Sequence, residues 1–171
     1  MKILHGRDTA IKVFIYPNEF YCLENFSAFK IYWQGILFAT SEQAYQWEKF
    51  PKQDVVREQI INAMSAHQAF KIAQENDHLR DPNWLQRRVP VMRDILAAKL
   101  RQHEYVRRKL FETGDRLIVE DSWRDDFWGA GADGTGQNML GRLWMQHREL
   151  LQKKPDAFGT LDSVSEVSSG R

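Results

Sequence analysis

Residues 30–50 read KIYWQGILFATSEQAYQWEKF and carry signals for two kinds of local structure. The runs on either side of Gln34-Gly35 are rich in β-branched and aromatic residues, which predicts two short strands joined by a tight turn. Thr40 and Gln43 have the spacing of a capping box, so a helix should begin just after Thr40 and run to about Phe50. The stretch therefore predicts a hairpin that leads into a helix.

Outward from this stretch the sequence predicts a mainly helical chain. Pro90 should kink or divide one of the helices. The strands and helices do not alternate along the chain, which argues against a doubly wound parallel sheet. The expected sheet is small and antiparallel, with further strand composition at 12–16 and 116–120. Apolar residues recur at helical spacing in five further segments, at 54–64, 65–76, 83–102, 104–113 and 137–152.

The chain has 171 residues, a length that suits one ordinary domain. We expect residues 1–154 to form this domain, because no linker composition interrupts them. Residues 155–171 are rich in serine, glycine and aspartate without periodicity, which predicts a disordered C-terminal tail.

The charge balance and the cysteine content indicate which binding partners and which cellular compartment to expect. Lysine and arginine total 24 against 23 aspartate and glutamate, so the net charge of +1 offers nucleic acid no general attraction. The single cysteine, Cys22, cannot form an internal disulfide, and no leader-like segment precedes the first apolar run, which predicts a cytoplasmic protein. No apolar run approaches the roughly 20 residues of a membrane span. The histidines lack metal-ligand spacing, so we expect no metal and no other cofactor.

The first candidate site segment is Glu24-Asn25-Phe26-Ser27, which places polar residues around an aromatic one between two predicted strands. A loop in that position can present Asn25 and Phe26 to a ligand. The alternative is an ordinary surface turn with Phe26 in the core.

The second candidate is one face of the predicted helix, which carries Glu42, Tyr45, Gln46 and Lys49 by the three-and-four spacing. At 1.5 Å per residue, Glu42 and Lys49 lie about 10 Å apart along the axis, enough for a sugar. The acid could protonate a departing ring nitrogen, and the amine could contact phosphate or form a Schiff base with an opened sugar. Favourable interaction of both charges with the helix dipole is the alternative explanation.

The third candidate is residues 125–138, which read DDFWGAGADGTGQN and run into the last predicted helix. Its glycines would let backbone amides approach an anion at the helix N-terminus, which predicts a phosphate cradle; a purely structural turn is the alternative. The literal G-x-G-x-x-G does not indicate a dinucleotide fold, because no strand leads into it. The residues predicted to bind substrate here are Asp126, Trp128, Gly129, Gly134, Gly136 and Asn138.

In order and spacing, the three segments resemble the NADAR (YbiA-like) family over roughly residues 12–151. The matching stretches are LENF at 23–26, TSEQAYQWEKF at 40–50 and FWGAGADGTGQNMLG at 127–141. Gln43 stands where the family has histidine, so a histidine-dependent proton transfer would be lost. Trp47, Glu48 and Glu24 also depart from the family pattern. Glu42, Lys49, Trp128 and Asn138 are retained.

The resemblance implies an α+β fold, a predominantly helical single domain with a small antiparallel sheet. It also implies a hydrolase that cleaves N-glycosidic bonds of a small phosphorylated ribosyl substrate, such as the ribosylamino-pyrimidine phosphates of early riboflavin biosynthesis. Glu42 and Lys49 would be its catalytic residues. Two alternatives remain open: a hydrolase that releases ADP-ribose from modified guanine, with ADP-ribosylated nucleic acid as partner, and a non-catalytic sensor of ADP-ribose or a nucleotide.

Overall fold

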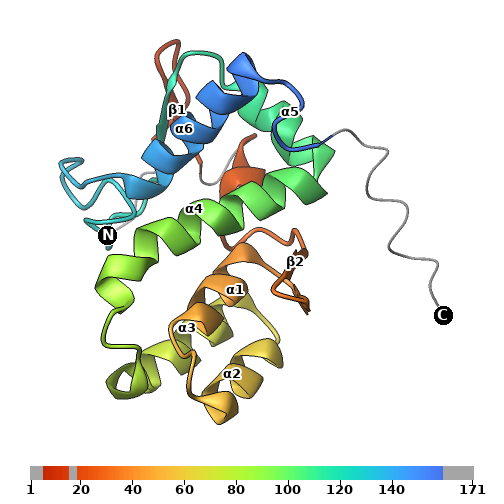
Figure 1. Cartoon of the computed structure of the whole chain (residues 1–171). Helices are drawn as coiled ribbons and strands as arrows, with labels where there is room; N and C mark the ends of the chain where they lie inside the picture. The colour runs from red at the N-terminus through yellow and green to blue at the C-terminus, as the bar shows by residue number, and fades with distance from the viewer. Residues whose placement is uncertain (1–5, 16–18, 160–171) are drawn as a thin grey trace. The chain divides into compact units, whose positions relative to one another are not determined.

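The structure is a computed structural model, and it describes residues 6–15 and 19–159 (Figure 1). These residues form two compact units, one of residues 25–99 and the other of the described residues before 25 and after 99. The predicted α+β class with a helical majority is confirmed. The α-helices are α1 (Ser41–Glu48), α2 (Asp54–Ile61), α3 (Ala66–Glu75), α4 (Trp84–Gln102), α5 (Glu104–Glu112) and α6 (Met139–Lys153), and the strands are β1 (Lys12–Phe14), β2 (Ile31–Trp33), β3 (Ile36–Phe38) and β4 (Leu117–Val119).

The hairpin in the unit of residues 25–99 forms as predicted. Strands β2 and β3 are antiparallel, and Trp33 pairs with Ile36 across a two-residue turn. Gln34 and Gly35 have φ angles of 48° and 79°. Positive φ at both central positions is the type I′ geometry, whose twist matches that of the flanking strands.

Helix α1 begins with the predicted cap. The Thr40 hydroxyl oxygen accepts a hydrogen bond of 3.1 Å from the backbone amide of Gln43. The Gln43 side chain extends the cap, because its Oε1 accepts from the Ala39 amide at 2.7 Å and its Nε2 donates to the Ile60 carbonyl at 2.8 Å. Gln43 thus ties the start of α1 to the end of α2.

The core of this unit lies where α1 packs against α2, α3 and β3. Ala44, Phe50 and Ile60 are fully buried, and the Trp47 ring packs edge-on against Phe38 at a centroid distance of 5.5 Å. All eight residues of α1 are buried, including five polar or charged ones. A polar helix at the centre of a unit is unusual, since polar groups are buried at a cost unless they are hydrogen-bonded.

Helix α4 is not divided at Pro90, which lies inside it. Proline removes the backbone hydrogen bond to the carbonyl four residues earlier. Pro90 and Gln86 are both exposed, so water can satisfy that carbonyl. The predicted division is therefore wrong, because the lost bond falls on the solvent side of the helix.

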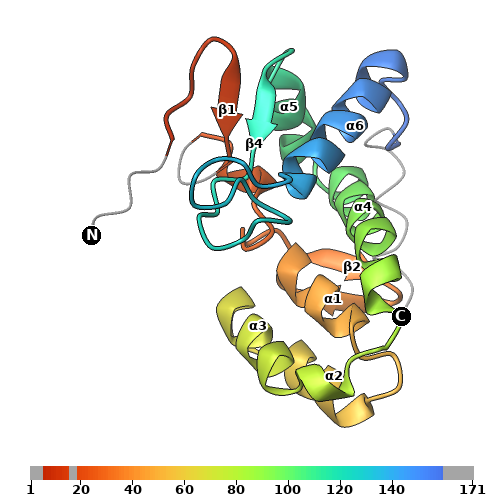
Figure 2. The same cartoon turned by 90° about the vertical axis from the view of Figure 1, so that its left-hand side faces the viewer.

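The other unit contains β1 and β4, which run parallel with Val13 opposite Ile118 (Figure 2). One of the two strand pairs therefore differs from the antiparallel sheet expected from the sequence. Parallel strands need a long crossover, and here the chain that forms α1 to α5 lies between the two strands in sequence. Helix α6 packs on β4 and α5, and Trp144 of α6 is fully buried.

The described chain continues past α6 to residue 159, and Phe158 is buried against the ring of His147 at 5.5 Å. The rest of the expected tail, residues 160–171, lies outside the described residues, as does Tyr16 at the end of the first predicted strand. The domain boundary at 154 stays a prediction. Among the described residues, no helix has the length and apolar character needed to cross a membrane.

Candidate active site

Glu42 occupies the first turn of α1 and is 6% exposed. Its backbone amide donates to the carbonyl of Asn25 at 3.0 Å, which holds the loop before β2 against the start of the helix. One turn later, the Gln46 side-chain amide donates to Glu42 Oε1 at 2.5 Å. Three of the residues predicted for the site, Asn25, Glu42 and Gln46, are therefore brought together.

Several buried polar atoms around Glu42 lack a partner. Asn25 Oδ1, Ser41 Oγ and Gln46 Oε1 are buried and accept or donate no hydrogen bond within the described part of the chain. Buried polar atoms in proteins are nearly always hydrogen-bonded, so each exception needs an explanation. The two amide oxygens are acceptors only. A ligand that offers hydroxyl or amine donors would satisfy them.

Lys49 and Phe26 lie at the edges of this group. Lys49 is the C-cap residue of α1, and its Nζ lies 5.4 Å from the centroid of the Tyr45 ring. The contact agrees with the predicted common face of Tyr45 and Lys49. Phe26 is 36% exposed, so the alternative that it is buried in the core is wrong.

The loop that carries Asn25 is anchored by residues that the sequence analysis did not single out. Asn25 Nδ2 donates to the sulfur of Met92 at 3.3 Å, and Lys99 Nζ donates to Ser27 Oγ at 2.8 Å. Ser27 and Lys99 are fully buried. The available signal was the position of Lys99 four residues after Ile95, on the apolar stripe of α4.

Glu48, a departure from the family pattern, is held by three donors. Its carboxylate accepts from Trp33 Nε1 at 2.7 Å, from Gln34 Nε2 at 2.6 Å and from Arg87 at 3.1 Å. Arg87 also pairs with Asp81. The Asn83 backbone amide and, next, the Arg87 guanidinium lower the pKa of Asp81 below its usual value. Because its three donors come from the hairpin and from α4, Glu48 has a structural role that links these elements.

The loop of residues 125–138 lies in the other unit, and the amides at its C-terminal end and at the start of α6 donate to carbonyls of the same loop. The Met139 and Leu140 amides, the first of α6, donate to the carbonyls of Phe127 at 3.0 Å and Trp128 at 3.1 Å. The amides of Gly136, Gln137 and Asn138 donate to the carbonyls of Ala130, Asp126 and Gly129. The amides of residues 136–140 are therefore used to close the loop, and the phosphate cradle stays a prediction.

Asn138 also has a structural position. It has a φ of 49°, and its side chain accepts from the Glu120 amide at 2.9 Å and donates to the Ile118 carbonyl at 2.8 Å. These bonds fix the loop to β4. They use one amide hydrogen and one lone pair of the carbonyl oxygen, and the contact of Asn138 with a ligand hydroxyl stays a prediction.

The glycines of the loop serve two different needs. Gly131 and Gly134 have φ angles of 72° and 78°, which side-chain-bearing residues rarely adopt. Gly136 has no room for a side chain, since a Cβ would lie 2.5 Å from the Gly129 carbonyl oxygen, and a Cβ on Gly129 would lie 2.7 Å from that of Ser122. All four positions are explained by the closed shape of the loop.

The remaining predicted residues of the loop are Asp126, which is exposed, and Trp128, which is half-buried with its ring 5.0 Å from that of Phe127. The predicted site residues thus fall into two groups, Asn25 to Lys49 in one unit and Asp126 to Asn138 in the other. No three potential metal ligands cluster anywhere in the part of the chain that the structure describes.

The chain is thus a small α+β protein in which the buried Glu42 lies beside polar atoms that lack hydrogen-bond partners among the described residues. The model of the NADAR domain matches residues 13–152, and the chain belongs to the NADAR family. That match spans both compact units as one domain.

Relatives of known name agree with this membership. The chain is 33% identical to the N-glycosidase YbiA of Escherichia coli over 85% of its own length and 90% of that protein. It is 39% identical to a riboflavin biosynthesis protein of Vibrio vulnificus, of which it spans only 35%. The NMR structure of E. coli YbiA superposes with a TM-score of 0.77 at 30% identity, over 89% of this chain and 91% of that one.

Proposed function

We propose that this chain is an N-glycosidase that hydrolyses the C1–N bond between a phosphorylated ribose and a base-like ring. Ribosylamino-pyrimidine phosphates of early riboflavin biosynthesis are the proposed substrates. The names of the E. coli and Vibrio relatives support the reaction and the pathway. The arrangement around Glu42 supports the position of the chemistry.

The observation that carries the proposal is the pair of unpartnered acceptors next to Glu42. Asn25 Oδ1 and Gln46 Oε1 are buried without a hydrogen bond among the described residues. The hydroxyls of a ribose are donors that could satisfy both oxygens. A sugar held in this way would lie against the one carboxylate of the cluster.

In the direct route, the C1–N bond lengthens and positive charge develops at the sugar. Glu42 as the carboxylic acid gives its proton to the leaving nitrogen, and the carboxylate that remains stabilises the positive charge. Water then adds its hydroxide to C1 and returns its proton to the Glu42 carboxylate. The products are ribose phosphate and the free amine of the ring.

The second route uses Lys49 as a nucleophile. Its neutral amine adds to C1 of the ring-opened sugar and expels the base as an amine, which leaves a protonated imine between Lys49 and the sugar. Water then hydrolyses the imine, which regenerates the lysine and releases the sugar aldehyde. In this route Glu42 carries protons between the steps.

The departure at position 43 does not favour the alternative of a non-catalytic sensor. Gln43 bonds to the Ala39 amide and the Ile60 carbonyl, so its side chain supports the helix cap. A change at this structural position leaves Asn25, Glu42 and Gln46 in place. Turnover therefore remains the proposed function.

The test is a mass-spectrometric screen of ribosylamino-pyrimidine phosphates, NAD-related compounds and ADP-ribosylated guanosine. Release of ribose phosphate from the first group supports the proposed substrate class. Release of ADP-ribose alone would identify the alternative hydrolase. Binding of ADP-ribose by calorimetry with no product from any compound would identify the sensor.

A further inference from the structure

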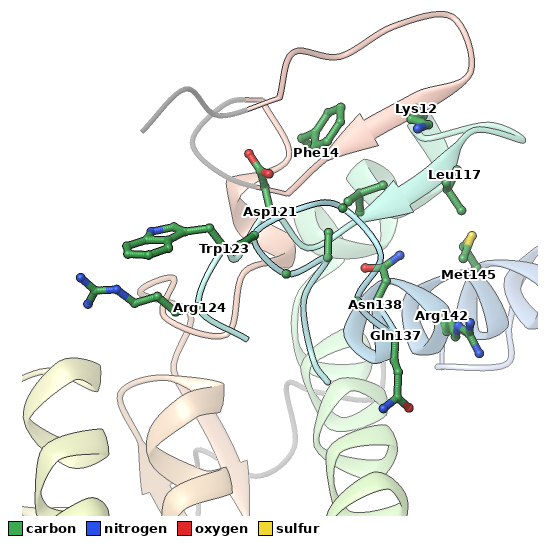
Figure 3. A pocket seen from close by; sticks show the side chains of 16 residues that line it. Lys12, Phe14, Leu117, Asp121, Trp123, Arg124, Gln137, Asn138, Arg142 and Met145 are labelled. Carbon is green, nitrogen blue, oxygen red and sulfur yellow. The ribbon is translucent and has the colours of Figure 1, made fainter. Parts of the chain in front are cut away.

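A cavity of about 1090 Å³ lies in the unit that contains β1 and β4 (Figure 3). Its walls come from these two strands, from residues 121–138 and from the first turns of α6; none of residues 25–99 lines it. Small-molecule sites commonly enclose about 300–1,000 Å³, so the cavity has room for a ligand of nucleotide size or more.

Three cations line the cavity: Lys12 of β1, Arg142 of α6 and Arg124 of the loop. Lys12 and Arg142 have no ion pair with any residue in 6–15 or 19–159. Asp121 is the only carboxylate in the lining, and it accepts a hydrogen bond of 2.7 Å from the Gly6 amide. Three cations against one carboxylate give the lining an excess of positive charge, which favours an anionic ligand.

Flat and apolar side chains lie beside these charges. Phe14, Trp123 and Met145 line the same cavity, and Trp123 is 43% exposed. The Arg124 guanidinium carbon lies 4.4 Å from the centroid of the Trp123 ring. An exposed indole with a cation over it is a surface on which a planar ring can stack.

We infer that this cavity binds a phosphorylated ligand with a planar ring, of the nucleotide class. Lys12 and Arg142 meet the phosphate, and Trp123 meets the ring. Side chains have to supply the positive charge, because the amides at the start of α6 are bonded within the loop. The inference does not depend on the proposed hydrolysis.

Calorimetry with AMP, adenosine and inorganic phosphate tests the inference on the whole chain. Lys12→Gln and Arg142→Gln should each weaken AMP binding about tenfold, as expected for loss of one charge-assisted contact. Adenosine binding should not change in either variant, and Trp123→Phe should weaken both AMP and adenosine. Arg101→Gln, which removes an exposed arginine outside the cavity, should bind AMP as the wild type does.

Two further variants, which keep the charge, separate loss of binding from loss of folding. Lys12→Arg and Arg142→Lys keep the charge and should retain AMP binding. Unchanged AMP binding in Lys12→Gln and Arg142→Gln, or no AMP binding by the wild type at millimolar concentration, would overturn the inference.

Discussion

Gln46 Nε2 donates a hydrogen bond of 2.5 Å to Glu42 Oε1, one turn earlier on α1. Both residues are buried. The bond fixes the carboxylate, while the Gln46 carbonyl oxygen is buried without a hydrogen bond to any described residue. In the proposed mechanism, this pair holds the sugar next to the acid.

Gln46→Ala should lower the hydrolysis rate constant about 10- to 100-fold. A hydrogen bond to a charged group contributes about 1.5–3 kcal/mol, and the substitution removes the donor to Glu42 together with the acceptor proposed for a sugar hydroxyl. Steady-state kinetics with the compound that the wild type cleaves would measure the effect. Gln74→Ala, on the exposed side of α3, is the matched control and should leave the rate unchanged. A Gln46→Ala rate within twofold of wild type would remove the pair from the mechanism.

Lys49 decides between the two chemical routes. If it forms an imine, borohydride reduction during turnover should add the mass of the sugar phosphate to the peptide that contains Lys49. Exposed Lys52 on the next turn is an internal control for non-specific labelling. An active enzyme with no adduct at Lys49 would exclude the imine and leave direct attack by water.

Asp81 predicts a pH dependence of stability. Its pKa is lowered from 3.8 by the Asn83 amide first and by Arg87 next, so the folded state favours the ionised form. The resulting stabilisation is present above pH 3.8 and is lost as the pH falls through the lower pKa of the folded state. Asp81→Asn should therefore be less stable than wild type near neutral pH, and the difference should shrink in acid.

Urea unfolding between pH 2 and pH 7 would measure this difference in the free energy of unfolding. Asp156→Asn, at an exposed position after α6, is the control and should show no such trend. A difference between Asp81→Asn and wild type that stays constant across the range would contradict the assignment.

Asn138 should matter for stability. Asn138→Ala removes one hydrogen bond to Ile118 of β4 and one to Glu120, and it leaves an alanine at a φ of 49°. We expect a loss of about 2–4 kcal/mol in the free energy of unfolding, because bonded groups lose their partners and the backbone is strained. Asn138→Gly tolerates the positive φ and should lose less. Chemical unfolding of both variants checks the order, and equal losses would show that the backbone conformation contributes little.

The sequence predicted local elements better than it predicted the pairing of distant strands. The hairpin turn at Gln34-Gly35 and the cap at Thr40 are local, so composition and spacing were sufficient to place them. The parallel pairing of β1 with β4 depends on residues far apart in sequence, and no local pattern encodes it. It was therefore missed.

The same distinction applies to the candidate site. Helical spacing correctly grouped Glu42 with Gln46, because residues four apart share a face. The glycine-rich segment looked equally suited to hold an anion or to close a loop. Only the hydrogen bonds of its amides, such as that of Leu140 to the Trp128 carbonyl, separate these two uses. Lys99 was missed because a lysine within a helix is usually exposed.

Glu42→Gln shows whether Glu42 performs the proton transfer in N-glycosidic hydrolysis. The measurement is the rate of ribose phosphate release at saturating substrate, for the compound that the wild type cleaves in the screen. The account predicts a loss of at least about 100-fold, as for removal of a general acid or base, with an unchanged melting temperature. Glu58→Gln, an exposed control on α2, should retain full activity. Release by Glu42→Gln at a rate close to that of the wild type would contradict the account.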